Sequence, residues 1–255
     1  MNRESQQRYW LYGMHAVKAA LGNPAREMHQ LWATSNALAR LQDILAARAQ
    51  HRTLPAPERI TAHEFQRILS KDAVHQGVAL QVSPLPEVTL PDWLQRWGST
   101  PPDGPLVVLD QVTDPHNVGA IFRSAAAFAA CGVLTTRRHS PPENAILAKT
   151  ACGALEHVPY LRVANLAQSL RQLHEHGWWC FGLDAGGTQD VAHLDWPERT
   201  ALVLGAEGKG LRPLTAAQCQ NLVRIALSEH MPSLNVSNAT AIALHAVYCH
   251  RDPIA

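Results

Sequence analysis

From Pro105 to Ala255 the chain repeats one rhythm: a short apolar run, a polar loop and a stretch with helical spacing. The run Leu106–Leu109 has no polar member, as expected of a strand that helices cover on both faces. Strands that alternate with helices predict an α/β domain with a parallel sheet and ligands bound beyond the strands' carboxyl ends. The other expected strands are Val133–Thr135, Trp178–Leu183, Ala201–Leu204 and Leu222–Leu227.

The helices of this half have their own signals. Asp114-Pro115 joins a capping acceptor to a proline and predicts a helix start, with the helix ending near Gly132. Leu166–His174 and Asn238–His250 have helical apolar spacing. Each polar loop after a strand is therefore expected to lead into a helix.

The first 83 residues predict a second, smaller α/β domain. Apolar spacing indicates helices over Trp10–Leu21 and Asn36–Ala49, with a further candidate helix at His63–Leu69. Met28–Ala33 and Gly77–Val82 are strand-like. Prolines then crowd residues 84–104, which we interpret as a linker with one short helix around Trp93 and Trp97. The second domain is expected over residues 105–255.

Composition sets broad limits. Of the 255 residues, 46% are hydrophobic and 17% are charged, which is the balance of a packed protein rather than of a disordered one. The net charge of +1 gives weak overall attraction to a polyanion. The basic residues are mostly arginine, which suits phosphate contacts and stacking on bases, although a GC-rich genome explains this bias equally well.

Cysteine and histidine show no metal-binding spacing. The five cysteines are odd in number and far apart, which predicts buried thiols in a reducing compartment. The fourteen histidines include no helical i, i+4 pair and are interpreted as scattered surface residues, so no metal is expected. The start, MNRESQQRYW, lacks an apolar run, and no segment approaches the length of a membrane span. We therefore expect a cytoplasmic protein without a membrane partner.

Three loops at predicted strand ends concentrate the polar residues. They follow the strands at Leu106, Ala201 and Leu222, and carry Asn117 and Arg123, Glu207, and Ser233 with Asn235. Alone, each has an ordinary structural explanation: a capping Asn with a solvated Arg, a glycine bend, and the cap of the last helix. The bend, Gly-x-x-Gly-x-Gly from Gly205, lacks both dinucleotide and P-loop spacing. Glu207 inside it needs a partner, for which Arg123 is the obvious candidate.

Together these loops resemble the three motifs of the SpoU family of RNA ribose 2′-O-methyltransferases, which belong to the SPOUT group. The matching segments are Thr113–Ser124 (TDPHNVGAIFRS), Leu202–Gly210 (LVLGAEGKG) and Ser233–Ser237 (SLNVS). In the front half, Tyr12–Val17 (YGMHAV) and Val74–Gly77 (VHQG) resemble a ribosomal-protein-L30-like RNA-binding domain, although packing or loop polarity also explains His15 and His75.

The resemblance implies a trefoil-knot domain that binds S-adenosylmethionine and works as a homodimer. The implied reaction is 2′-O-methylation of a ribose in RNA, with a guanosine of large-subunit ribosomal RNA as the expected substrate. The implied catalytic residues are Asn117, Arg123, Glu207, Ser233 and Asn235. The implied cofactor-binding residues are Leu204, Gly205, Ile225, Leu227 and Leu234.

Two chemical roles are open for Arg123. The family assigns removal of the hydroxyl proton to this arginine, but guanidinium stays protonated at any ordinary pH. The alternative role is electrostatic: Arg123 binds the adjoining phosphate and stabilises the developing oxyanion while water takes the proton. Arg123 is expected to be essential in either role.

The chain departs from the family pattern near the third motif. Ile225-Ala226-Leu227 replaces Ile-Pro-Met, Ser228–Pro232 replaces a small glycine-containing loop, and Asn238 replaces a small apolar residue. Two alternatives follow: the same chemistry on transfer RNA, or a non-catalytic RNA-binding or ribosome-assembly protein. An L30-like front domain favours ribosomal RNA over transfer RNA, and the retained motif side chains argue against the scaffold.

Overall fold

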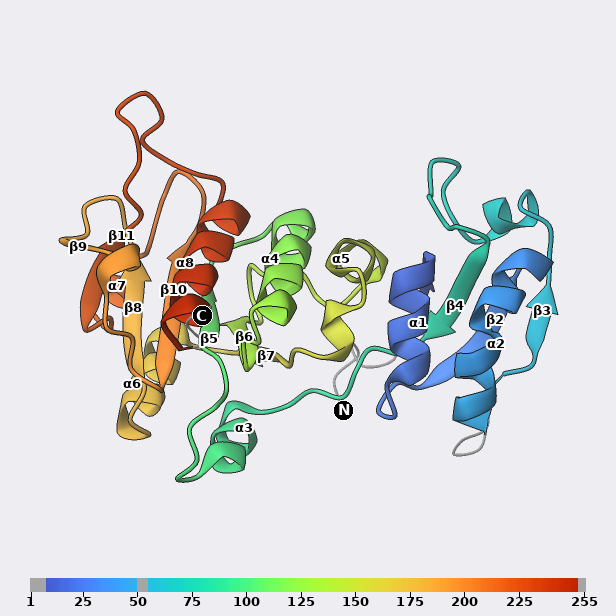
Figure 1. Cartoon of the computed structure of the whole chain (residues 1–255), viewed down its shortest axis with the longest axis horizontal. Helices are drawn as coiled ribbons and strands as arrows, with labels where there is room; N and C mark the ends of the chain where they lie inside the picture. The colour runs from blue at the N-terminus through green and yellow to red at the C-terminus, as the bar shows by residue number, and fades with distance from the viewer. Residues whose placement is uncertain (1–7, 50–54, 252–255) are drawn as a thin grey trace. The chain divides into compact units, whose positions relative to one another are not determined.

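The structure, a computed structural model, describes residues 8–49 and 55–251 (Figure 1). Residues 1–7, which carried the expectation of no targeting segment, lie outside this range. The chain forms two compact units. The front unit consists of the described residues up to Pro86 and of Pro142–His157, and the rear unit consists of Glu87–Pro141 and of the described residues from Val158.

The front unit has a four-stranded sheet in the order β1-β4-β2-β3. β4 is antiparallel to β1 and β2, whereas β3 runs parallel to β2. The elements are β1 (Tyr9–Tyr12), α1 (Met14–Gly22), β2 (Met28–Ala33), α2 (Ser35–Ala49), β3 (Pro57–Arg59), the 3-10 turn η2 (Glu64–Arg67), β4 (Val78–Val82), α5 (Ala145–Ala151) and η3 (Ala154–Glu156). The predicted strand at residues 28–33 and helix from residue 36 are confirmed.

Two front-unit predictions were wrong in detail. Trp10–Tyr12 is not helical but forms β1, because Trp10 and Leu11 pair with Gln81 and Leu80 of β4. Gly13, with a φ of 90°, then breaks the chain direction before α1 begins at Met14. The expected helix over 63–69 is only a 3-10 turn. Short aromatic-rich segments thus follow their strand partners rather than a helical period.

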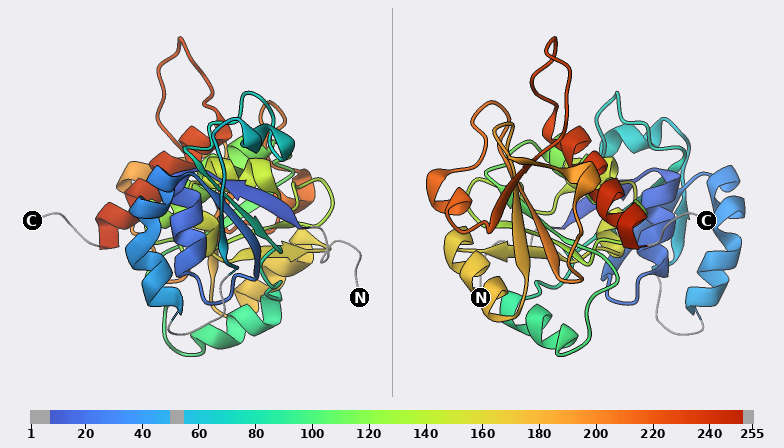
Figure 2. Two further views of the ribbon diagram at one scale, coloured as in Figure 1. Left: turned by 90° about the vertical axis from the view of Figure 1, so that its right-hand side faces the viewer. Right: turned by 60° about the vertical axis from the view of Figure 1, so that its left-hand side comes forward.

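The rear unit is a seven-stranded, fully parallel sheet in the order β7-β6-β5-β10-β8-β11-β9, which confirms the predicted fold class (Figures 1 and 2). Its strands are β5 (Leu106–Asp110), β6 (Gly132–Thr136), β7 (Tyr160–Val163), β8 (Trp179–Leu183), β9 (Gln189–Asp190), β10 (Thr200–Gly205) and β11 (Asn221–Arg224). Its helices are α3 (Leu90–Trp97), α4 (Pro115–Ala127), α6 (Leu166–Glu175), η4 (Val191–His193), α7 (Pro213–Ala216) and α8 (Val236–Arg251).

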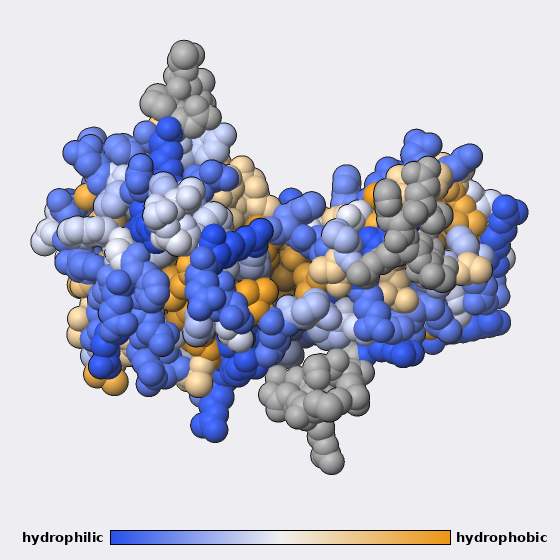
Figure 3. Space-filling model, turned by 90° about the horizontal axis from the view of Figure 1, so that it is seen from below, coloured by the Kyte–Doolittle hydropathy of each residue, from blue (hydrophilic) through white to orange (hydrophobic). Residues whose placement is uncertain are grey.

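Helices cover both faces of this sheet. Trp93 of α3 and Leu170 of α6 pack in one buried cluster with Leu106, Val108 and Val203. The alternate strand residues point to the opposite face, where α4 and α8 pack against each other. The continuous apolar runs of the sequence are therefore explained by burial on two sides. On the surface seen in Figure 3 hydrophilic residues predominate in both units, with apolar residues in small patches.

Three rear-unit boundaries differ from the expectations. β11 ends at Arg224, because the N–H of Ala226 donates to the Asp190 carboxylate at 3.0 Å instead of to a neighbouring strand. α4 ends at Ala127 rather than near Gly132, and α8 begins at Val236. The short elements α5 and β7 had no sequence signal that predicted them.

A buried arginine organises the front unit. The side chain of Arg26 has no exposed surface and contacts two carboxylates, Glu143 and Glu156, each at 2.6 Å. Its guanidinium also donates to the carbonyl of Ser83 at 2.8 Å. The hydroxyl of Tyr9 donates to Glu143 at 2.7 Å. Through this cluster the segment 142–157 becomes part of the front unit although it is distant in sequence.

Candidate functional site

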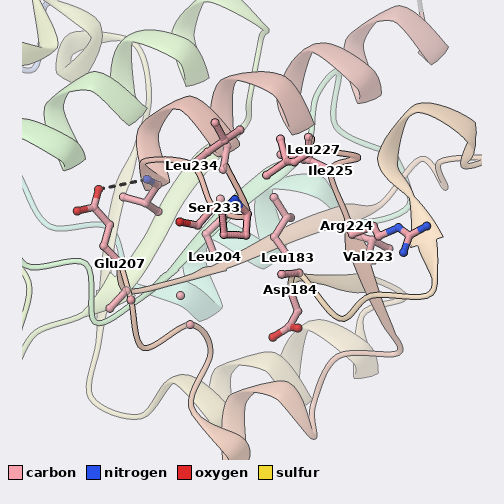
Figure 4. Close-up of a pocket in the computed structure, with 18 of the residues that line it drawn as sticks. Leu183, Asp184, Leu204, Glu207, Val223, Arg224, Ile225, Leu227, Ser233 and Leu234 are labelled. Carbon is pink, nitrogen blue, oxygen red and sulfur yellow. Dashed lines mark hydrogen bonds between the residues drawn. The ribbon is translucent and has the colours of Figure 1, made fainter. Parts of the chain in front are cut away.

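The parallel rear sheet brings the three predicted loops to one edge. β5, β10 and β8 are neighbours, and β11 follows β8, so the loops after these strands leave the sheet at the same side. Residues of the loops after β8, β10 and β11 surround a cavity of about 760 Å³, a size typical of a small-molecule site (Figure 4). The switch in strand order between β5 and β10 falls beside it.

Glu207 joins all three loops through one carboxylate oxygen. Its Oε1 accepts hydrogen bonds from Nδ2 of Asn117 at 3.2 Å, from the backbone N–H of Val236 at 3.3 Å and from Nδ2 of Asn235. Nδ2 of Asn235 also lies 3.0 Å from Oδ1 of Asn117. Asn117 and Asn235 are 118 positions apart in the chain. Three separate sequence motifs therefore meet at one atom.

Asn235 both caps the start of α8 and contacts Glu207. Its Oδ1 accepts from the backbone N–H of Ser237 at 2.9 Å, which caps the start of α8, while its Nδ2 faces Glu207. The alternative that Asn117 caps α4 is wrong, because Asp114 accepts from the N–H of His116 at 2.9 Å. The amide of Asn117 is therefore available for Glu207.

The five residues expected at the cofactor all line the cavity: Leu204, Gly205, Ile225, Leu227 and Leu234. Glu207 and Ser233 line the same cavity, and Figure 4 shows the leucines of β8, β10 and the loop before α8 around it. Their roles in binding stay predictions. The sequence interpretation missed Asp184 and Arg224, which lie at the ends of β8 and β11 and also line the cavity.

An ion pair with a buried carboxylate holds the loop that carries Glu207. The Asp110 carboxylate, with no exposed surface, accepts from Nε of Arg212 at 2.7 Å and from its backbone N–H at 3.0 Å. Within the loop, Gly205 lies so close to Gly210 that a Cβ on Gly205 would be 2.0 Å from the Gly210 carbonyl carbon. The loop therefore has little freedom to move away from the cavity.

Arg123 lies apart from this network. It is exposed and lines a second hollow between α4 and α8, with Ser124, Phe128 and Ser237. The expected ion pair between Arg123 and Glu207 does not form among the described residues. Six residues along a helix turn a side chain about 240° and advance it about 9 Å, so Arg123 points away from the Asn117 face.

Within residues 8–49 and 55–251, no three or more His, Cys, Asp or Glu side chains gather as metal ligands would. No helix in the described part of the chain is long and apolar enough to cross a membrane.

A parallel sheet with its polar motifs at one carboxyl edge, beside a cavity of cofactor size, places the chain among α/β proteins that bind a ligand at that edge. Residues 104–245 match the SpoU rRNA methylase family, and residues 10–88 match the family described as RNA 2′-O ribose methyltransferase substrate binding. The chain belongs to the SpoU rRNA methylase family.

Its relatives cover both units. An uncharacterised tRNA/rRNA methyltransferase of Synechocystis is 37% identical over 94% of this chain, which spans 62% of that relative. The 23S rRNA (guanosine-2′-O-)-methyltransferase of Ralstonia nicotianae is 39% identical over 92% of both chains. The crystal structure of the SpoU methyltransferase AviRb of Streptomyces viridochromogenes with AdoMet has a TM-score of 0.80 and 20% identity, covering 99% of this chain and 95% of that one.

Proposed function

We propose that the protein methylates the ribose 2′-hydroxyl of a guanosine in large-subunit ribosomal RNA, with S-adenosylmethionine as the methyl donor. The observation that carries the proposal is the meeting of three family motifs at Oε1 of Glu207, beside the cavity. The substrate follows from the relatives: the Ralstonia nicotianae enzyme, which spans both units, is named for a 23S rRNA guanosine.

The cavity suits the proposed cofactor. Leu204, Leu227 and Leu234 supply apolar walls for an adenine ring, while Glu207 and Ser233 supply polar groups at the same cavity. Most of the lining residues belong to loops at strand ends, where backbone N–H and C=O groups can serve a ligand. Bound S-adenosylmethionine would supply an electrophilic methyl group.

The protein's own contribution is chiefly alignment. Holding the attacking hydroxyl in line with the methyl group contributes up to about 7–11 kcal/mol to lowering the barrier. In the transfer the ribose oxygen would form a bond to the methyl carbon as the carbon–sulfur bond breaks, and the hydroxyl proton would pass to water. Asn117 and Asn235 hold Glu207, and Glu207 with Ser233 orients the ribose. Arg123 lies outside the Glu207 network, in the hollow between α4 and α8, so we assign it the binding of a phosphate that adjoins the target ribose.

From the family resemblance we also propose separate roles for the two domains and a homodimeric assembly. Residues 1–83, with the segment 142–157 that packs among them, would bind RNA. Residues 84–104 would link the units, with α3 packed on the rear sheet, and the rest of 105–255 would carry the catalytic domain with a trefoil knot, as the family resemblance implies. A homodimer would cover apolar surface on α8, where Ile242 is 41% exposed. A ribosomal substrate would put this reaction in the cytoplasm.

The test combines cells and purified protein. Maps of 2′-O-methyl marks in ribosomal RNA from cells with and without the protein should differ at one guanosine. An unchanged map would refute the ribosomal substrate. In vitro, Arg123→Ala and Arg123→Lys should each reduce methyl transfer to transcribed ribosomal RNA, and near-normal rates in folded variants would remove Arg123 from the mechanism. Calorimetry with S-adenosylmethionine excludes the non-catalytic scaffold if the protein binds it.

A further inference from the structure

The front sheet has two faces of different burial. Leu11, Leu80 and Leu31 stand side by side on β1, β4 and β2, and each is at most 1% exposed. The residues next to them in each strand point to the opposite face. There Trp10, Gln81 and Gln30 form one cross-strand row, and the tryptophan and both glutamines retain solvent access. One face is thus packed and the other partly open, as is common for antiparallel sheets.

An aromatic pair dominates the open face. Tyr12 and Trp32 flank Ala79 in the next row, and the ring of Trp32 meets that of Trp10, with centroids 5.2 Å apart and planes tilted by 49°. Ala79 has no exposed surface, whereas both tryptophans are only partly buried. Nε1 of Trp32 has no hydrogen-bond partner among the described residues.

Charge is distributed unequally across this face. At the β1 edge stand Arg8, exposed just before the strand, and Lys149, whose Nζ lies 5.0 Å from the centre of the Tyr12 ring. At the other edge, β3 pairs Glu58 with Trp32. A polyanion lying on the face would therefore run its phosphates along β1 and direct its bases toward β4 and β2.

We propose that this aromatic face, defined by Trp10, Tyr12, Gln30, Trp32 and Gln81, binds unpaired bases of the RNA substrate. The indole rings offer stacking surfaces to bases, and the two glutamines offer amide donors and acceptors to base edges. Arg8 and Lys149 contact the backbone. The inference rests on the proposed function, which makes RNA the substrate, and it assigns the single-stranded part of that substrate to the front unit.

The test measures binding separately from methyl transfer. Full-length protein is titrated into fluorescently labelled short oligoadenylate, and fluorescence anisotropy gives the dissociation constant. Trp10→Ala and Trp32→Ala should each weaken binding about ten-fold or more, which is the usual loss for one stacked base. Trp10→Phe keeps an aromatic ring and should stay within about three-fold of wild type. Trp179→Ala is the matched control, because Trp179 is 48% exposed but lies on β8 of the rear unit.

A charge variant covers the case in which an alanine variant does not fold. Gln81→Glu is nearly isosteric, lies in the middle of the face and adds a negative charge, so it should weaken binding at low salt several-fold more than at high salt. Wild-type affinity in folded Trp10→Ala, Trp32→Ala and Gln81→Glu proteins would overturn the proposal and leave the face to a protein partner. Stronger binding of the wild type to a duplex than to the single strand would also overturn it.

The two proposals fail in different ways. If the protein binds oligoadenylate through the aromatic face but leaves ribosomal RNA unmethylated, the proposed function fails and the binding face stands. If the variants methylate ribosomal RNA and bind oligoadenylate as the wild type does, the enzyme stands and the face is wrong.

Discussion

The carboxylate of Asp110, fully buried at the end of β5, contacts three nitrogens of Arg212. These are the backbone N–H at 3.0 Å, Nε at 2.7 Å and Nη2 at 2.7 Å. Arg212 directly follows the loop that carries Glu207, and it is this loop that lines the cavity. The side chain of Arg212 is 44% exposed, so its cation is not trapped when the carboxylate is lost. The pair therefore positions the loop more than it stabilises the fold.

Asp110→Asn should accordingly affect the cofactor more than the fold. The side-chain NH2 of asparagine would face the N–H groups of Arg212, which it cannot accept from. The loop that Arg212 holds would therefore be released. We expect S-adenosylmethionine affinity to fall about a hundredfold, with a smaller loss of about 1 kcal/mol in the free energy of unfolding. Calorimetry and urea unfolding measure the two effects. Asp195→Asn, at an exposed carboxylate of the same unit, is the control. Unchanged affinity would show that the pair does not position the loop.

Asn235→Asp tests the junction at Glu207. The change removes the Nδ2 donor and sets a second carboxylate against Oε1 of Glu207. Two adjacent carboxylates repel, so one of them gains a proton more readily than it would alone. We expect methyl transfer to fall about a hundredfold near neutral pH and to recover partly as the pH is lowered. The pH–rate profile is the measurement. Asn165→Asp, which keeps the cap of α6, should behave as wild type.

Arg26→Met tests the buried cluster of the front unit. It leaves Glu143 and Glu156 without their cation, at side-chain exposures of 10% and 2%. Loss of one partner from such a site typically costs about 3–5 kcal/mol. Urea unfolding followed in the front unit should show a loss of this size. Arg67→Met is the matched control, since Arg67 is 71% exposed in its pair with Glu64 and should unfold close to wild type. Equal behaviour of the two variants would contradict the role of Arg26.

Gly205→Ala tests the close contact inside the Glu207 loop. A Cβ at this position would lie 2.0 Å from the carbonyl carbon of Gly210. Because that carbon belongs to the backbone, no side-chain rotation could relieve the clash. We expect a loss of about 1–3 kcal/mol in unfolding free energy and strongly weakened cofactor binding. Gly22→Ala, whose Cβ would meet its nearest neighbour at an ordinary 3.9 Å, should leave both measurements near wild type. Intact binding in Gly205→Ala would mean that the loop adjusts freely.

The sequence predicted the rear sheet well because burial on both faces leaves continuous apolar runs such as Leu106–Leu109. It predicted the front unit less well: Trp10–Tyr12 has the spacing of a helix, and only pairing with β4 decides its conformation. It did not predict α5 and β7, which are seven and four residues long and therefore too short to show a period.

The site shows the same division. Motif side chains pointed to Glu207, Asn117 and Asn235, but their hydrogen bonds depend on a fold that joins positions 118 residues apart. Arg123 was expected beside Glu207, and the helical turn sends it elsewhere. Arg26 gave no signal at all, because its carboxylate partners lie 117 and 130 residues away. Contacts between distant charges are invisible to local patterns.

Alkaline pH should weaken the rear unit through its buried thiols. Burial, with a smaller contribution from Asp110, raises the pKa of Cys219 to about 12, and burial also raises the pKa of Cys180 well above its usual value. Above pH of about 8.5 the unfolded chain releases these protons while the folded protein keeps them, so the free energy of unfolding falls as the pH rises. Each such thiol contributes a slope of about 1.4 kcal/mol per pH unit up to its folded pKa. Urea unfolding at several pH values from 7.5 upward should show the decline, and Cys219→Ala should remove one thiol's share of it. A slope unchanged by Cys219→Ala would show that this thiol ionises as readily in the folded protein as in the unfolded chain.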